Sequence, residues 1–167
     1  MEIKPRNDPA SPGQRTAVVG IGSELNGDDA AGIQVARELS KAASFPADFL
    51  AIDGGSIPEN ASGPLRRFSP DLVILVDAAD LGSPPGTIDW LEKDQIDGMS
   101  ASSHTLPLSV LGGYLESELG CRVEYLGIQP KQLEFAAELS PEVADAVKEI
   151  ITVFKREFSS EIKRPSS

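Results

Sequence analysis

A glycine-rich turn that ends in two adjacent carboxylates, near the start of the chain, limits the possible folds more than any other feature. The run before it, residues 16–20, is short, apolar and rich in β-branched residues, which is typical of a buried parallel strand. The stretch after it, residues 29–43, repeats apolar side chains at helical spacing. A strand, a glycine turn and a helix in this order indicate the opening of an α/β fold.

The turn has the glycine spacing of a phosphate-binding loop but lacks its chemistry. Gly22 and Gly27 are correctly spaced, yet Asp28 and Asp29 stand where that motif has Lys and Ser or Thr. Two negative charges at a helix start would repel a phosphate. A dinucleotide-binding fingerprint would need a third glycine where Leu25 stands. The turn is therefore not predicted to bind a nucleotide.

The acid pair has a structural and a functional interpretation. Asp28 at the start of the helix is a candidate N-cap, since a carboxylate there accepts free backbone N–H groups. A cap needs only one carboxylate. We therefore expect Asp28 to act as the cap or as a supporting residue, and Asp29 to point into the crevice above the strand, where it could bind a cation.

Further segments have the pattern of strands or of helices. Residues 72–76 are continuously apolar, which predicts a central strand covered on both faces. Residues 87–91 alternate, which predicts an edge strand. Two further strands are predicted at 49–52 and 122–128. One further helix is predicted from an N-cap at Thr105 to Gly120, and another begins at Ser140. Residues 57–70 are predicted to form a weak helix, and residues 94–103 a loop.

Strands that alternate with helices predict an α/β fold in three layers. We expect a mostly parallel, twisted, five-stranded sheet with one antiparallel edge strand and with helices on both faces. A single α/β domain over residues 16–158 is expected, with flexible tails at 1–15 and 159–167.

Composition excludes several classes of function. The net charge of −11 argues against a nucleic-acid partner, because phosphate binding needs a basic face. No stretch approaches 18 apolar residues and no apolar signal core follows Met1, so we expect a cytoplasmic protein without a membrane partner. We also expect a monomer. The single cysteine, Cys121, rules out an internal disulfide, and its position suits a small core residue better than a nucleophile.

Acidic residues follow several of the predicted strands. In open α/β sheets ligands bind beyond the carboxyl ends of the strands, so these acids are expected at one rim. They are Asp28 and Asp29, Asp53, Asp77 and Asp80. Structural alternatives remain for three of them: Asp53 as the acceptor that holds the Gly54-Gly55 turn, Asp77 as a strand-end cap on a neighbouring loop, and Asp80 as a turn former.

Two of these acids and the only histidine make a candidate metal site. Asp29 and Asp77 alone would suit Mg²⁺ or Ca²⁺, whereas the addition of His104 shifts the preference toward Ni²⁺, Zn²⁺ or similar ions. The alternative for His104 is a helix-start residue that forms local hydrogen bonds.

Other catalytic arrangements fit less well. The nucleophile motif G-x-S-x-G is absent, and a zinc-protease motif with two histidines is impossible with one. A receiver-type domain, in which Asp77 would accept a phosphoryl group with Mg²⁺, stays open as an alternative, although no Lys directly follows the last strand. A non-catalytic metal-binding module is a further alternative.

Five motifs, in order and with matching spacing, make residues 16–155 similar to the hydrogenase maturation endopeptidases. Details of the second and fifth motifs resemble the hydrogenase-3, or formate hydrogenlyase, branch most. The motifs are Gly20-Ile21-Gly22 with Gly27-Asp28-Asp29-Ala30-Ala31-Gly32, Asp53-Gly54-Gly55-Ser56, Val76-Asp77-Ala78, Ser103-His104-Thr105-Leu106-Pro107-Leu108 and Leu126-Gly127-Ile128-Gln129-Pro130.

The resemblance implies an endopeptidase that trims a C-terminal extension from the precursor of a [NiFe]-hydrogenase large subunit after nickel insertion. It implies that Asp29, Asp77 and His104 are the catalytic and metal-binding residues, that the nickel is carried by the substrate, and that no organic cofactor is needed. It also implies substrate recognition by the segment Asp53, Gly54, Gly55 and Ser56.

The sequence departs from the family pattern at two places. Ser23 stands where many members have Asn, and Asp29 where several have Glu. The shorter acid changes the reach of the ligand by one methylene group, which bears on metal geometry more than on function.

Overall fold

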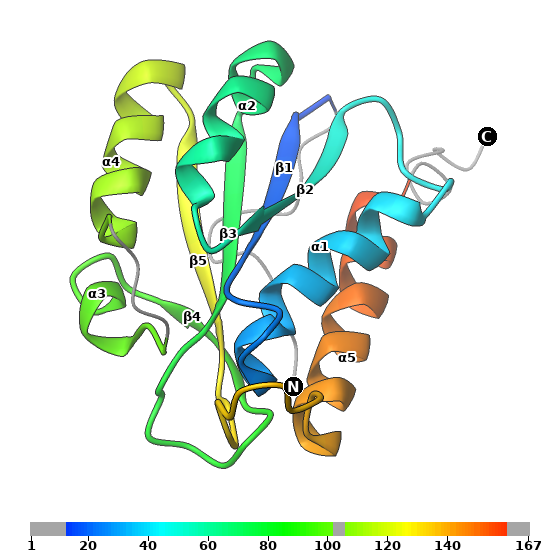
Figure 1. Cartoon of the computed structure of the whole chain (residues 1–167). Coiled ribbons are helices and arrows are strands. Elements are labelled where there is room, and N and C mark those ends of the chain that lie inside the picture. Colours follow the sequence, from blue (N-terminus) through cyan, green and yellow to red (C-terminus); the bar gives the residue numbers. More distant parts are fainter. Residues whose placement is uncertain (1–12, 102–105, 160–167) are drawn as a thin grey trace.

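The computed structural model describes residues 13–101 and 106–159 (Figure 1). Within these ranges, no helix combines the length and the apolar character that crossing a membrane requires. The elements, in chain order, are β1 (Thr16–Ile21), the 3₁₀ turn η1 (Gly27–Ala30), α1 (Ala31–Lys41), β2 (Phe49–Gly55), the 3₁₀ turn η2 (Pro58–Ala61), α2 (Ser62–Phe68), β3 (Leu72–Ala78), β4 (Ile88–Leu91), α3 (Ile96–Met99), α4 (Leu108–Leu119), β5 (Arg122–Ile128) and α5 (Pro141–Phe158).

The five strands form one sheet in the order β2-β1-β3-β5-β4. β1, β2, β3 and β5 are parallel, and the short edge strand β4 is antiparallel to β5. The predicted fold class is therefore confirmed, including the antiparallel edge strand. The chain leaves β1 to form β2 on one side and later forms β3 on the other side, so the strand order reverses between β1 and β3. In open α/β sheets ligands bind at such a reversal, beyond the carboxyl ends of the two strands, and we refer to this place as the crevice.

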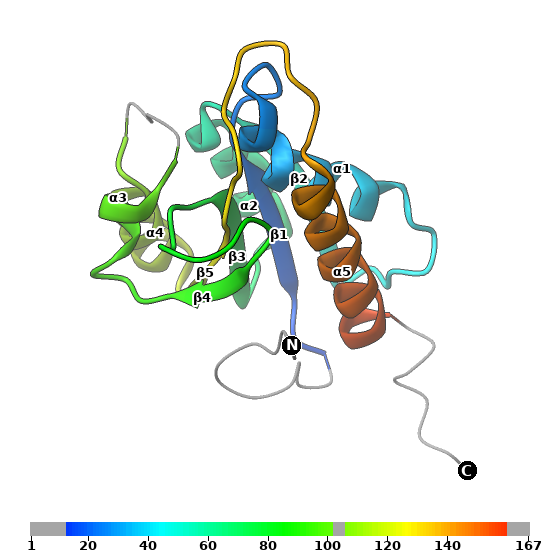
Figure 2. The ribbon, with the colours of Figure 1, turned by 90° about the horizontal axis from the view of Figure 1, so that it is seen from below.

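Helices cover both faces of the sheet (Figures 1 and 2). Alternate residues of the strands point to opposite faces, so each strand contributes to two cores. Val18 and Ile74 pack under α1 and α5, whereas Val19 and Leu75 pack under α2, α3 and α4. Every residue of β3 is buried, which confirms the prediction that this strand is central.

Two glycines let α1 lie directly against the carboxyl ends of β1 and β3. A Cβ atom on Gly20 would lie 2.1 Å from the carbonyl oxygen of Gly32, and one on Gly32 would lie 2.2 Å from the carbonyl oxygen of Val76. No side chain fits at either position without moving backbone. This close approach fixes the start of α1, and with it the acidic turn, over the crevice.

Replacing Gly32 by Ala is therefore expected to destabilise the fold, because the added methyl group meets the carbonyl oxygen of Val76 and must displace α1. Overpacking of this kind costs about 3 kcal/mol. The midpoint of thermal unfolding, followed by circular dichroism, should fall by about 10 °C. Gly113→Ala on α4, where an added Cβ has no atom within 4 Å, is the matched control and should be neutral or stabilising. Equal midpoints for the two variants would contradict the packing argument.

Several predicted boundaries differ from the structure. The first helix was expected from residue 29, but α1 begins at Ala31 after the 3₁₀ turn η1. The predicted loop 94–103 contains the one-turn helix α3, whose Ile96 is buried in the core. The fourth helix was expected to start from a cap at Thr105, but α4 begins at Leu108 with Pro107 in the N-cap position, and Thr105 lies outside the described residues.

The predicted N-terminal tail extends too far. Arg15 was assigned to the tail, yet its guanidinium donates two hydrogen bonds to the carbonyl oxygen of Phe68, at 2.8 and 2.7 Å, and lies over the ring of that residue. Its backbone N–H also binds Asp71. At the other end Ser159 is buried and its N–H bonds to the carbonyl oxygen of Lys155. Residues 1–12 and 160–167 of the two predicted tails lie outside the described residues.

Candidate functional site

The crevice between β1 and β3 holds two of the three predicted metal ligands. Asp29 lies in η1, which follows β1, and Asp77 lies at the end of β3. Both acids are almost completely buried, with 4% and 5% of their surface exposed. The rule that parallel strands end at one rim predicted this arrangement correctly for both residues.

Asp29 is oriented by the glycine turn. Its Oδ2 atom accepts the backbone N–H of Ser23 at 2.9 Å. Gly22, with a φ of +141°, allows the turn to come so close that a Cβ atom there would lie 1.9 Å from the carbonyl oxygen of Asp29. The bond to Asp29 comes from the backbone of Ser23, so the replacement of the family's Asn by Ser leaves it in place.

Asp77 is oriented by the chain that leads toward the predicted histidine. Its Oδ2 atom accepts a hydrogen bond from the hydroxyl of Ser100 at 2.7 Å. The backbone of Ser100 pairs antiparallel with Ala79, and the N–H of Ala101 bonds to the carbonyl oxygen of Ala78. The interpretation of Asp77 as a strand-end cap on a neighbouring loop is thus partly confirmed, since it binds a loop side chain. Ser100 was not identified from the sequence, because one serine in a polar stretch carries no signal.

His104 lies outside the described residues, so the structure does not test the complete ligand set. Across residues 13–101 and 106–159, no group of three or more His, Cys, Asp or Glu side chains is arranged to hold a metal ion. The two predicted ligands that the structure describes, Asp29 and Asp77, both carry hard oxygen donors.

The second glycine motif is joined to the glycine turn that orients Asp29. Gly55 has a φ of +57°, its N–H binds Oδ1 of Asp53 at 3.0 Å, and its carbonyl oxygen accepts the N–H of Gly22 at 3.0 Å. The structural interpretation of Asp53, as the acceptor that holds the glycine turn, is confirmed. The second oxygen of Asp53 pairs with Arg37 at 2.7 Å, while the side chain of Ser56 is exposed.

Asp80 is confirmed as a turn former. Its Oδ1 atom accepts the N–H of Gly82 at 3.1 Å. The loop that follows is held by Gln129, whose Oε1 accepts the N–H of Leu81 at 2.6 Å. Gln129 belongs to one of the sequence motifs, but its structural role could not be read from the sequence.

The predicted N-cap role of Asp28 is wrong for the helix that follows it. The Asp28 carboxylate is fully buried and accepts the N–H groups of Lys131 and Gln132 and both the N–H and the hydroxyl of Ser140, at 2.7 to 3.1 Å. It therefore binds the loop between β5 and α5 instead of capping α1. The loop between β5 and α5 offers the carboxylate several backbone N–H groups at once, and such charge-assisted hydrogen bonds are strong. The start of α1 offers fewer free N–H groups, because the 3₁₀ turn η1 runs directly into it. The expected supporting role of Asp28 next to Asp29 stays a prediction.

Neither Cys121 nor Tyr125 is a candidate nucleophile. Burial raises the pKa of the Cys121 thiol, whose sulfur lies 3.5 Å from the carbonyl oxygen of Leu115. Burial also raises the pKa of Tyr125 to about 12, so its phenol stays protonated. The interpretation of Cys121 as a core residue is confirmed.

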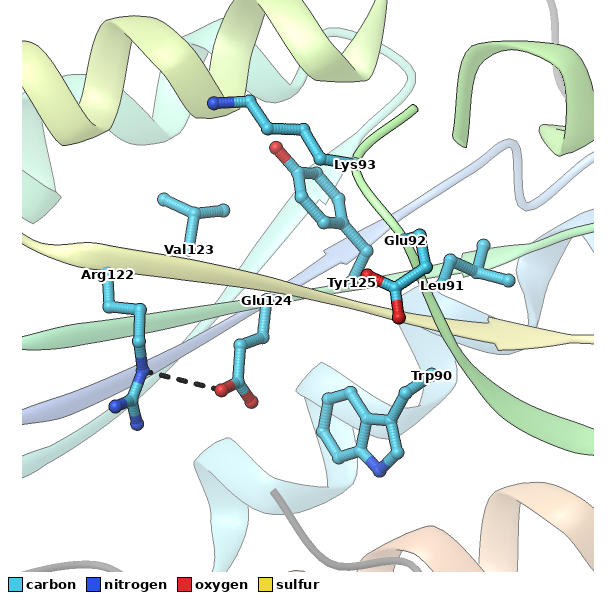
Figure 3. Close-up of a pocket in the computed structure, with 8 residues that line it drawn as sticks. All are labelled: Trp90, Leu91, Glu92, Lys93, Arg122, Val123, Glu124 and Tyr125. Atoms are coloured by element: carbon cyan, nitrogen blue, oxygen red, sulfur yellow. Dashed lines mark ion pairs between the residues drawn. The ribbon is translucent and has the colours of Figure 1, made fainter. Parts of the chain in front are cut away.

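A cavity of about 170 Å³ lies at the edge of the sheet, away from the acidic crevice (Figure 3). It is lined by the end of β4 and the amino-terminal half of β5, whereas Asp77 pairs with Gly127 near the carboxyl end of β5. Arg122 and Glu124 form an ion pair of 3.3 Å at its wall. None of the predicted site residues lines this cavity.

Comparison with known proteins gives a consistent result. Residues 33–157 match the sequence model of a family described as hydrogenase maturation protease, HycI. The hydrogenase 3 maturation protease of Escherichia coli is 36% identical over 81% of this chain and 84% of its own length. A putative hydrogenase maturation protease of Methanocaldococcus jannaschii is 32% identical over 73% of this chain and 76% of its own. The crystal structure of a [NiFe] hydrogenase maturation protease from Thermococcus kodakarensis superposes with a TM-score of 0.78 and 29% identity, covering 87% of this chain and 92% of the other.

Proposed function

This chain belongs to the hydrogenase maturation protease family, and from that membership we propose that it removes the C-terminal extension of a [NiFe]-hydrogenase large-subunit precursor after nickel has been inserted. Family membership makes it a protease, which decides against the receiver-type domain and the non-catalytic metal-binding module. The observation that carries the finer proposal is the pair of buried carboxylates, Asp29 and Asp77, at the reversal of strand order.

Asp29, Asp77 and His104 are proposed to contact the nickel that the substrate carries. The backbone bond between Ala101 and Ala78 supports this set, because it anchors the chain three residues before His104 beside the end of β3. Three residues of extended chain span at most about 10 Å, so the length of the chain is compatible with the proposed contact. Two carboxylates and an imidazole suit a nickel ion better than the carboxylates alone.

Contact with substrate-bound nickel would explain how one peptide bond is selected. An ion already ligated by the substrate fixes that part of the precursor against the two acids, so attack on a nearby peptide bond becomes effectively intramolecular. The bond cleaved is the peptide C–N bond, and water supplies the hydroxyl and the proton to the two products. A carboxylate of the pair that is not occupied by the ion is the candidate general base.

Four other expectations belong to the proposal. We propose that the segment from Asp53 to Ser56 takes part in substrate recognition, since the side chains of both residues are exposed beside the crevice. We also propose that the enzyme needs no organic cofactor and acts as a cytoplasmic monomer.

Nickel loading of the substrate is the decisive variable for this proposal. Incubation of the purified protein with nickel-loaded and nickel-free precursor, followed by mass spectrometry of the product, should show removal of the extension only from the loaded form. The His104→Ala variant should cleave neither form, because one of the three proposed contacts to the ion is lost. Equal cleavage of both forms by the unaltered protein would contradict the role of nickel while leaving the protease activity intact.

A further inference from the structure

Three large apolar side chains are exposed on two neighbouring loops beside the acidic crevice. Leu25 is 56% exposed, Leu133 40% and Phe135 77%. Leu25 belongs to the turn between β1 and η1, whereas Leu133 and Phe135 belong to the loop between β5 and α5. We refer to these three residues as the apolar platform.

The two loops of the platform are joined through their backbones. Asn26 and Phe135 form an antiparallel bridge, and the N–H of Ala136 donates to the carbonyl oxygen of Leu25 at 2.7 Å. The loops lie side by side at one end of the molecule, above the start of α1 and α5 (Figure 2). The bridge therefore holds the two loops next to each other, although they are more than 100 positions apart in the sequence.

Hydrogen bonds hold the loop that carries Leu133 and Phe135 in one conformation. The buried carboxylate of Asp28 binds the N–H groups of Lys131 and Gln132, and the Gln132 side chain in turn accepts the N–H of Glu134 at 2.8 Å and donates to the carbonyl oxygen of Glu138 at 2.9 Å. Ala136 adopts a left-handed φ of +61°, a conformation that costs free energy for any residue except glycine. The loop is thus held in a strained conformation with its phenylalanine in solvent.

An exposed aromatic residue on a rigid loop is poorly explained by folding alone. Leaving Phe135 in water forgoes the burial energy that drives folding, while its rigid support reduces the entropy cost of binding. Large aromatic side chains of this kind are typical anchors of protein interfaces.

The position of the platform identifies its partner. Leu25 is four residues from Asp29, and Ser23 of the same turn donates its N–H to the Asp29 carboxylate. The turn that carries Leu25 thus also orients Asp29, so a protein bound at Asp29 would pass close to this turn.

We infer that the apolar platform docks the body of the large-subunit precursor while its tail enters the crevice; this inference rests on the proposed function. The exposed acids Glu134 and Glu138 stand among the platform residues, so the matching patch on the precursor is apolar with a basic rim.

Steady-state cleavage of the nickel-loaded precursor tests the platform. Phe135→Ala and Leu25→Ala should each raise KM by at least about tenfold, with kcat unchanged, because they remove binding that is equal in the ground state and the transition state. Val110→Ala, a truncation of a 51% exposed side chain on α4, is the matched control and should leave both constants unchanged. All three variants replace exposed side chains, and their thermal midpoints should equal that of the unaltered protein.

The outcomes separate the platform from the proposed function. Normal cleavage by the unaltered protein, with KM unchanged in both platform variants, would overturn the platform alone. A fall in kcat without a change in KM would also overturn it, because the residues would then act on the chemistry. Failure of the unaltered protein to cleave the loaded precursor would overturn the proposed function and the platform together. A dimer in analytical ultracentrifugation that Phe135→Ala converts to a monomer would assign the platform to a second copy of the chain.

Discussion

Replacing Asp77 by Asn is expected to reduce kcat/KM for the nickel-loaded precursor by at least about 100-fold. The amide has the shape of the carboxylate, and its oxygen can still accept the hydrogen bond from Ser100. It carries no charge, so it is a poor ligand for a divalent ion and cannot accept a proton from water. The loss should therefore come from the chemistry of the crevice and not from unfolding.

The matched control for this variant is Asp80→Asn, which makes the same chemical change three residues along the chain. Asp80 accepts the N–H of Gly82, a bond that an amide oxygen can also make. Its activity should stay within about twofold of the unaltered protein, as for other surface substitutions. Cleavage and the thermal midpoint are measured side by side for both variants. Full activity of Asp77→Asn would exclude Asp77 from the site, and a large loss in both variants would indicate a general effect of charge on the rim.

The strands could be predicted from the sequence because the order of apolar and polar residues in each strand reflects which of its faces are buried. The continuous apolar run of β3 follows from cover on both faces, and the antiparallel edge position of β4 follows from its alternation. The rim position of Asp29 and Asp77 then followed from topology, since parallel strands end on the same side.

Features built by contacts between distant segments could not be predicted. Asp28 was expected to cap the next helix, but its partners stand 103 to 112 residues further along the chain. The helix α3 has only four residues, and it is held by burial of Ile96 and by hydrogen bonds from Ser109 to Asp97. Local patterns carry no information about such partners, so general capping and loop preferences gave the wrong prediction at both places.

The apolar platform could not be predicted from the sequence for the same reason. Leu133 and Phe135 stand in a polar stretch after the last strand, and nothing in their spacing marks them as a surface. Their importance depends on the backbone bridge to Asn26, which only the fold creates.

Replacing Asp28 by Ala is expected to lower the free energy of unfolding by about 4 kcal/mol, because the change leaves three backbone N–H groups without their acceptor. Lys131, Gln132 and Ser140 donate these groups, and water can reach the first two more easily than the buried third. Urea unfolding followed by circular dichroism measures the loss. Asp89→Ala, the removal of an exposed carboxylate on β4, is the matched control and should stay within about 0.5 kcal/mol of the unaltered protein.

A double-mutant cycle tests whether the loss comes from the link between the two halves of the chain. Ser140→Ala removes the hydroxyl that donates to Asp28 at 2.8 Å and should cost about 1 kcal/mol by itself. Once Asp28 is absent, that hydroxyl has no carboxylate to bind, so the double variant should lose less stability than the sum of the single variants. Strict additivity, or an Asp28→Ala variant as stable as the control, would mean that the buried carboxylate does not hold the loop. In that case the support of the apolar platform would have to come from the Gln132 side chain and from the bridge to Asn26.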